Sequence, residues 1–198
     1  GEKLSAMLVA GLKANERGIP AVLDPVGSGG ASFRTAAARQ LIDNIDFIAI
    51  RGNPSEIFSL VSDEAETRGV DTLLSVEDIS ETAPLIARKL KTTVVVTGEV
   101  DFVTDGNRIV RISNGSELFG RVTGSGCAVT GILAAFMSVV ADPVIASSSA
   151  LSYFGVAGEK AEKECGGPGT FVPFFLDALY DVTPEYLIRK AKIISSNT

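Results

Sequence analysis

The feature that most constrains the fold is a recurring order along the chain: a short apolar run, then polar or glycine-rich residues, then a helix-like segment. The apolar runs cover residues 21–23, 46–50 and 93–97. Parallel strands need long crossover connections, which are usually helices, so strands that alternate with helices favour a parallel sheet. We therefore predict an α/β fold with a mostly parallel sheet sandwiched by helices, and ligands at the carboxyl ends of its strands.

Capping signals and apolar spacing place the helices and one hairpin. Ser32 is expected to cap a helix that ends near Ile42, and Asn53 begins another, with Pro at its first position and Glu56 at its third. Further helices are expected over residues 4–17 and 75–91, and after Thr183. Asp105-Gly106 joins residues 100–104 to residues 108–112 in a β-hairpin, which we place at one edge of the sheet.

The longest apolar stretches, residues 127–141 and 144–157, are separated by Asp142-Pro143. Each is shorter than the ~20 residues that a membrane-spanning helix needs. We interpret them as two buried helices and expect no membrane association. Because the first residues also lack the layout of a signal peptide, we expect a cytoplasmic protein.

Composition excludes several kinds of chemistry. With 198 residues, 45% of them hydrophobic, the chain can form one domain over residues 1–198. A net charge of −6 without a basic run argues against a nucleic-acid partner. The 2 cysteines, in no paired spacing, argue against zinc and a disulfide framework, and the 0 histidines exclude histidine-based catalysis. Proton transfer is left to Asp, Glu, Cys, Lys or water.

Polar residues follow the predicted strands and converge on one edge of the sheet: Asp24, the group Arg51, Asn53 and Glu56, and the segment Thr97-Gly98-Glu99. A second element, Gly124-Ser125-Gly126-Cys127, leads directly into a long helix. Backbone N–H groups at such a helix start hold anions, and phosphate is the natural candidate. Since neither a GxxxxGK[ST] loop nor a complete GxGxxG is present, nucleotide binding would use this helix start.

The segment Val122–Cys127, VTGSGC, is similar to the anion-hole motif of ribokinase-like kinases. Most branches of that superfamily have Asp at its last position, whereas hydroxyethylthiazole kinases have Cys. Further segments of this chain resemble motifs of the same family and occur in the same order, at residues 23–27, 51–56, 97–101 and 167–171. The chain thus resembles the hydroxyethylthiazole kinases over nearly its whole length.

This resemblance implies phosphorylation by ATP of the primary alcohol of 4-methyl-5-(2-hydroxyethyl)thiazole, in thiamine salvage. It implies the following roles: ATP contact by Arg51, Thr97 and Asn53, Mg²⁺ near Asp24 and Glu56, thiazole contact at Gly124, and an anion hole at Ser125 and Gly126 with Cys127 beside the reacting hydroxyl. A helix N-terminus favours the thiolate of such a cysteine. The family also implies a homotrimer and an additional N-terminal segment, so we expect this chain to be N-terminally incomplete and to bind thiazole better once that segment is restored.

Simpler interpretations stand beside these. Asp24 is also a typical turn residue, Glu56 a capping partner, and Cys127 a small buried side chain; Asp101 and Asp105 look like hairpin residues. The same fold would suit a kinase of another alcohol, pyridoxal-like or sugar-like, or a non-catalytic nucleotide-binding fragment. A nicotinamide dehydrogenase is a further alternative, in which residues 27–32 would be an incomplete dinucleotide-binding motif. That motif needs an acidic residue at the end of the next strand, where this chain has Arg51.

Overall fold

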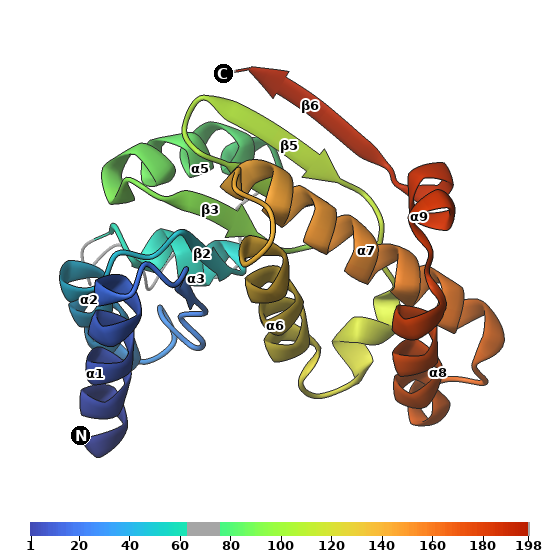
Figure 1. Cartoon of the computed structure of the whole chain (residues 1–198), viewed down its shortest axis with the longest axis horizontal. Helices are drawn as coiled ribbons and strands as arrows, with labels where there is room; N and C mark the ends of the chain where they lie inside the picture. Colours follow the sequence, from blue (N-terminus) through green and yellow to red (C-terminus); the bar gives the residue numbers. More distant parts are fainter. Residues whose placement is uncertain (63–75, 198) are drawn as a thin grey trace.

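The computed structural model describes residues 1–62 and 76–197, and its centre is a 6-stranded sheet in the order β1-β2-β3-β4-β5-β6 (Figure 1). The strands β1 to β3 run parallel, and β3 to β6 pair antiparallel. The strands are β1 (Val22–Leu23), β2 (Ala49–Gly52), β3 (Thr93–Val96), β4 (Asp101–Thr104), β5 (Arg108–Ile112) and β6 (Ile193–Asn197). The predicted α/β class is confirmed, but the sheet is mixed rather than mostly parallel, because only the pairings of β1 with β2 and of β2 with β3 are parallel.

Successive strand residues point to opposite sides of the sheet, so each strand contributes side chains to both faces, and both faces are buried. Val95 and Val103 pack on one face, and Val94, Val96 and Phe102 pack on the other. The first face is covered by α6 (Ser125–Met137), α7 (Pro143–Glu164) and α8 (Pro168–Asp181), and the second by α2 (Ser32–Asn44), α3 (Pro54–Ser59) and α5 (Val76–Leu90). The predicted sandwich of helices is confirmed.

The two apolar stretches form helices as predicted, but only α7 is buried along its length. In α6 the buried residues are Val129, Leu133 and Met137, which lie four positions apart on one face. The small residues between them, such as Gly131 and Ala134, are exposed. The prediction that α6 is buried was therefore wrong, since only one of its faces packs. No helix in the described part of the chain is long and apolar enough to cross a membrane.

In Figure 1 the N-terminus lies at the lower left and the C-terminus at the top, with α1 (Glu2–Glu16) packed beside α2 and α9 (Pro184–Lys190) packed beside α7. Thr183 caps α9 as predicted, accepting a hydrogen bond from Tyr186 N. Two C-terminal elements were not predicted. One is the helix α8, which begins at the turn of residues 167–171, and the other is the strand β6, which pairs with β5. Because β6 lies beyond the hairpin, the hairpin is not at the edge of the sheet.

Some predicted boundaries also shift. The strand expected over residues 46–50 runs from Ala49 to Gly52, so Arg51 lies inside β2 rather than after it. Ser32 does not cap α2: the N-cap residue is Ala31, and no side-chain hydrogen bond among the described residues caps that helix. Thr35 instead binds the loop that precedes α2, because its hydroxyl accepts from Gly29 N and contacts Ala31 O. The first residue of the helix expected over residues 75–91, residue 75, lies outside the described residues.

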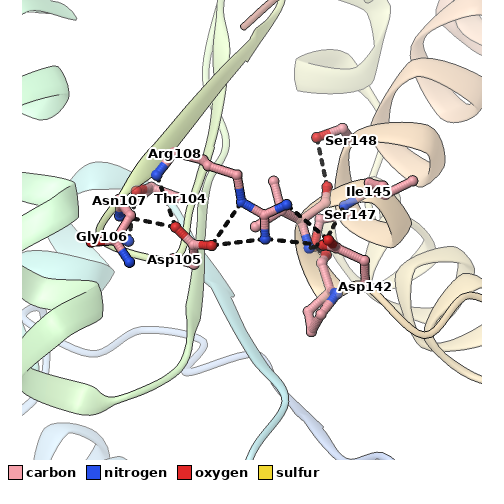
Figure 2. Close-up of polar contacts among 11 residues, drawn as sticks. Thr104, Asp105, Gly106, Asn107, Arg108, Asp142, Ile145, Ser147 and Ser148 are labelled. Atoms are coloured by element: carbon pink, nitrogen blue, oxygen red, sulfur yellow. Dashed lines mark hydrogen bonds and ion pairs between the residues drawn. The ribbon is translucent and has the colours of Figure 1, made fainter. Parts of the chain in front are cut away.

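The hairpin between β4 and β5 is tied to the start of α7 by the guanidinium of Arg108 (Figure 2). Its Nε donates to Asp105 Oδ2 at 2.8 Å and its Nη1 donates to Asp142 Oδ2 at 2.8 Å. Asp142 also caps α7 by accepting from Val144 N and Ile145 N. The hydrogen bond from Arg108 lowers the pKa of Asp142. One arginine thus positions the N-terminus of the most buried helix.

The loop after β5 is held against the middle of α7 by Asn114, which is 5% exposed. Its amide donates to Glu159 Oε1 at 3.0 Å and to Lys190 O at 2.9 Å, and its Oδ1 accepts from Lys192 N at 2.7 Å. Gly155 makes this approach possible, since a Cβ there would lie 2.5 Å from Asn114 O. Asn114 therefore joins this loop to α7 and to the C-terminal segment.

We predict that Gly155→Ala lowers the free energy of unfolding by about 1 to 3 kcal/mol, because the added methyl group overlaps the Asn114 backbone. Urea unfolding followed by circular dichroism measures this change. Gly131→Ala is the matched control: it is also a helix glycine, but a Cβ there meets nothing within 4 Å. It should leave stability unchanged or raise it by up to about 1 kcal/mol. Equal stability of the two variants would contradict the close packing at Gly155.

Candidate active site

The guanidinium of Arg51 is the centre of the site. Its Nη2 donates to Thr97 Oγ1 at 2.5 Å, and its Nη1 makes longer contacts, of 3.4 Å each, with Asp24 Oδ2 and Gly126 O. These partners come from the ends of β1 and β3 and from the first turn of α6. The predicted convergence of strand ends is therefore present, and Arg51 connects its members.

Asp24 and Arg51 form a largely buried ion pair, each side chain being 13% exposed. Asp24 Oδ2 also accepts from the hydroxyl of Thr130 at 2.8 Å. The other oxygen, Oδ1, and the Nε of Arg51 are buried and have no hydrogen-bond partner in the part of the chain that the structure describes. Buried polar atoms are nearly always paired, so we expect an ordered water or a ligand to pair with these two atoms.

Glu56 forms the predicted capping box with Asn53. Asn53 Oδ1 accepts from Glu56 N at 2.8 Å, and Glu56 Oε2 accepts from Asn53 N at 2.9 Å. Glu56 Oε1 accepts from Gly27 N at 2.9 Å, which fixes the loop after Asp24. Each carboxylate oxygen of Glu56 thus already accepts from a backbone N–H group, Oε2 within the capping box and Oε1 from the loop after Asp24. The simpler interpretation of Glu56 as a capping partner accounts for the first of these contacts and not for the second.

The glycine-rich turn forms the start of α6, as predicted. Gly124 is the N-cap residue, with φ of 93°, a left-handed conformation that favours glycine. Ser125 Oγ donates to Phe119 O at 2.9 Å. At Gly126 a Cβ would lie 3.2 Å from Arg51 Nη1, so the missing side chain lets Arg51 lie across this turn. Cys127 follows on the same turn and is exposed, so it is not the small buried side chain of the simpler interpretation.

A pocket of about 720 Å³ adjoins this cluster. The predicted residues Arg51, Asn53, Thr97, Ser125 and Gly126 line it, whereas Asp24, Glu56, Gly124 and Cys127 are not among its lining residues. The apolar part of the remaining lining comes from the 3-10 helix η1 (Glu117–Arg121) and from α6 and α7: Phe119, Val129, Leu151 and Phe154. Further lining residues come from the turn after Thr97 and from the loop after β5, among them Gly98 and Asn114. Phe119 stacks on Phe154 at 4.6 Å between ring centroids. The pocket thus combines a polar cluster with an aromatic wall.

Comparison with known proteins decides the family. The sequence profile of the hydroxyethylthiazole kinase family matches residues 1–185. The chain belongs to the hydroxyethylthiazole kinase family. It is 47% identical over 194 residues to a hydroxyethylthiazole kinase of Desulfotalea psychrophila, covering 98% of this chain and 71% of that protein. It is 43% identical to the one of Moorella thermoacetica, covering 98% of this chain and 72% of the relative.

Solved structures agree with this assignment. The chain superposes on a hydroxyethylthiazole kinase protein from Pyrococcus horikoshii with a TM-score of 0.88 and 38% identity, over 98% of this chain and 72% of that one. The pyridoxal kinase of Staphylococcus aureus, solved with pyridoxal, matches with a TM-score of 0.61 at 20% identity, over 89% of this chain and 61% of that one, which supports the ribokinase-like fold alone. Membership of the hydroxyethylthiazole kinase family excludes the dehydrogenase interpretation.

Sequence reasoning missed several residues of this family member's site. Thr130 carried one available signal, since it lies four residues after Gly126 and so on the same helix face. Asp101 was assigned to the hairpin, and it does begin β4, but it also lines the pocket. The apolar wall at Phe119 and Phe154 left no local signal, because its members are distant in sequence and meet only in the fold.

The carboxyl of Asp101 is the strongly perturbed acid of the pocket. Burial raises its pKa from 3.8 to about 6, although the hydrogen bond from Gly98 N and the charge of Arg51 act in the opposite direction. Asp101 Oδ1 accepts from Gly98 N at 3.0 Å and so fixes the turn that follows Thr97. Because the pKa is raised in the folded state, the folded chain binds more protons than the unfolded chain between these two values. The ionised carboxylate therefore destabilises the fold above about pH 6.

We predict that Asp101→Asn removes this cost, since an amide oxygen can still accept from Gly98 N but carries no charge. Relative to the unsubstituted chain, the variant should gain about 1 to 3 kcal/mol of unfolding free energy between pH 4.5 and pH 8. Urea unfolding at both pH values measures the difference. Asp43→Asn, which alters an exposed carboxylate on α2, controls for net charge. A pH-independent difference at Asp101 would mean that its carboxyl is not perturbed.

Proposed function

We propose that this chain transfers the γ-phosphoryl group of ATP to the primary alcohol of 4-methyl-5-(2-hydroxyethyl)thiazole, in thiamine salvage. One observation carries the proposal: the guanidinium of Arg51 joins Thr97, Asp24 and the first turn of α6 beside a 720 Å³ pocket. Fixed positive charge and backbone N–H groups at one point are what phosphoryl transfer requires, since its catalysis is mostly positioning and charge stabilisation.

The lining of the pocket suits a nucleotide. Phe119 and Phe154 offer an aromatic wall for a base, while Arg51 and Thr97 offer donors for phosphate oxygens. The unpartnered Nε of Arg51 adds a further buried donor, counted over the described residues. Asn53 lies at the N-terminus of α3, where its side chain is already engaged in capping. We therefore assign Arg51 and Thr97 to the phosphates of ATP, with Asn53 as a neighbouring wall of the pocket.

A magnesium ion fits the residues present, in a limited way. Asp24 Oδ1 is a buried carboxylate oxygen without a partner among the described residues, which is the donor type that Mg²⁺ prefers. Within residues 1–62 and 76–197 no cluster of three or more acidic, Cys or His side chains could hold a metal ion. Mg²⁺ commonly uses one or two carboxylates plus substrate phosphates. When bound, Mg²⁺ would neutralise negative charge on the phosphates. Asp24 would hold the ion, and Glu56 would lie nearby, because it holds the loop that follows Asp24.

In the transfer itself, the alcohol oxygen forms a bond to the γ-phosphorus while the bond from that phosphorus to the β–γ bridging oxygen breaks, and ADP leaves. The N–H groups at the start of α6, around Ser125 and Gly126, stabilise the negative charge of the transferring group. We assign thiazole contact to Gly124 from the family resemblance, because Gly124 begins α6 outside the lining of the pocket. The hydroxyl proton passes to Cys127 or to water, since the chain contains 0 histidines.

We further propose that residues 1–198 act as one kinase domain in a cytoplasmic homotrimer, as the family resemblance implies. Exposed apolar side chains support an assembly that buries additional surface. They lie on α1, on α8 and just after α6, for example Val9 at 70%, Leu176 at 59% and Val139 at 79% exposure.

We predict that the chain binds ATP in a magnesium-dependent way and that Arg51→Ala weakens this binding about 10- to 100-fold. The expected loss corresponds to one charge-assisted contact. Isothermal titration with ATP, with and without EDTA, measures the affinity. Arg17→Ala removes an equal charge from an exposed position beside α1 and should bind ATP normally. ATP binding that is indifferent to both EDTA and Arg51→Ala would refute the proposed site. Assays with the thiazole alcohol and with pyridoxal then identify the acceptor.

We predict that Cys127→Ala slows turnover about 10- to 1,000-fold, around or below the contribution of a positioned base, while ATP affinity changes little. The loss is partial because the anion hole uses backbone N–H groups, which the substitution leaves in place. Cys127→Asp should be faster than Cys127→Ala, since a carboxylate is ionised at neutral pH unless it is strongly desolvated. Steady-state rates from pH 6 to pH 9 test this. A Cys127→Ala rate equal to the unsubstituted rate throughout would show that the thiol has no catalytic role.

A further inference from the structure

Thr130 makes a contact that the proposed chemistry has not yet used. It lies on α6, one turn after Gly126, and its Oγ1 is 2.8 Å from Asp24 Oδ2 and 3.1 Å from Gly126 O. Neither acceptor can donate when Asp24 is ionised, and a threonine hydroxyl has a single hydrogen. The hydrogen goes to the carboxylate, because that acceptor is both closer and charged. The bond joins two residues that are 106 positions apart in the chain.

This bond determines how Asp24 is oriented. The contact of Asp24 Oδ2 with Arg51 Nη1 is long, at 3.4 Å, so the 2.8 Å bond from Thr130 is its best-formed hydrogen bond. With Oδ2 held in this way, Oδ1 is the oxygen left without a partner among the described residues. A carboxylate that rotated freely would exchange the two oxygens and lose this distinction.

We infer that Thr130 is a positioning residue, which holds Asp24 Oδ2 so that Oδ1 is presented to the divalent cation bound with the nucleotide phosphates. The inference rests on the proposed function and adds a residue to it. Outer-shell hydrogen bonds of this kind orient metal-binding carboxylates, and their loss typically costs 10- to 100-fold in metal affinity. Because Thr130 lies on the helix that begins at the anion hole, the same bond also fixes that helix against the end of β1.

A purely structural role has a different signature. Threonine hydroxyls in helices often bond the carbonyl four residues earlier, and the contact with Gly126 O has this pattern. If that were the whole role, replacing Thr130 would change stability without changing the response to the metal. Thr92 offers a matched comparison: its hydroxyl donates to Phe47 O at 2.6 Å, at the opposite end of β3 from Thr97.

The test measures ATP affinity by isothermal titration across a series of Mg²⁺ concentrations, for the unsubstituted chain, Thr130→Val, Thr130→Ser and Thr92→Val. Valine keeps the branched shape and removes the hydroxyl, while serine keeps the hydroxyl. We expect Thr130→Val to raise the Mg²⁺ concentration for half-maximal ATP binding about 10- to 100-fold. ATP affinity without Mg²⁺ should be unchanged, and Thr130→Ser should restore most of the response. Thr92→Val should lower the melting temperature and leave the Mg²⁺ response unchanged.

A normal Mg²⁺ response in folded Thr130→Val, with its melting temperature lowered as in Thr92→Val, would overturn the role of Thr130 and leave the proposed function intact. An equal loss of Mg²⁺ response in Thr130→Val and Thr130→Ser would also overturn it, because the hydroxyl would then not be the group that matters. If the unsubstituted chain bound no ATP at any Mg²⁺ concentration, the proposed function would fail, and the role of Thr130 with it.

Discussion

The burial of the Arg51 guanidinium is the constraint on which the rest of the site depends. A charge that is 13% exposed must be compensated, since an unpaired buried charge costs several kcal/mol. Arg51 lies inside β2, and its compensating groups come from the ends of the neighbouring strands β1 and β3 and from α6. These elements must therefore meet at one point for the charge to be tolerated. The parallel register of β1, β2 and β3 supplies that meeting point, because it brings their carboxyl ends to one edge of the sheet.

The sequence predicted those parts of the fold that depend on neighbouring residues. The capping box at Asn53 and Glu56 and the turn at Asp105-Gly106 are formed by residues a few positions apart, and both are present. The strand β6 was missed because Ser195, Ser196 and Asn197 have little strand preference of their own. It forms because β5 offers an unpaired edge, with Ile112 opposite Ile193. The exposure of α6 was missed for a similar reason, since its apolar composition does not say which of its faces finds a partner.

The site divides in the same way. The strand ends could be expected to converge, and the small residues before α6 indicated an anion-binding helix start, so Arg51, Thr97 and Gly126 could be predicted from the sequence together with the family resemblance. The hydroxyl of Thr130 and the pocket-facing carboxyl of Asp101 could not. What each of them does depends on a partner that is distant in sequence: Asp24, which accepts from Thr130, and the positive charge of Arg51, which acts on Asp101. Glu56 combines both cases, because its capping contact with Asn53 N is local, whereas its contact with Gly27 N joins two loops that are distant in the sequence.

The amide of Asn114 joins the loop that lines the pocket to Lys190 and Lys192, at the last turn of the chain before β6. Because these bonds lie directly before β6, we expect detachment of β6 from β5 to loosen the loop as well. A ligand that orders the loop must then slow hydrogen exchange in β6, although no atom of that strand lines the pocket. Conversely, a fusion or tag that disturbs residues 190–197 would reduce affinity at a pocket it does not touch. The outermost strand is thus connected, through Asn114, to the loop that lines the pocket.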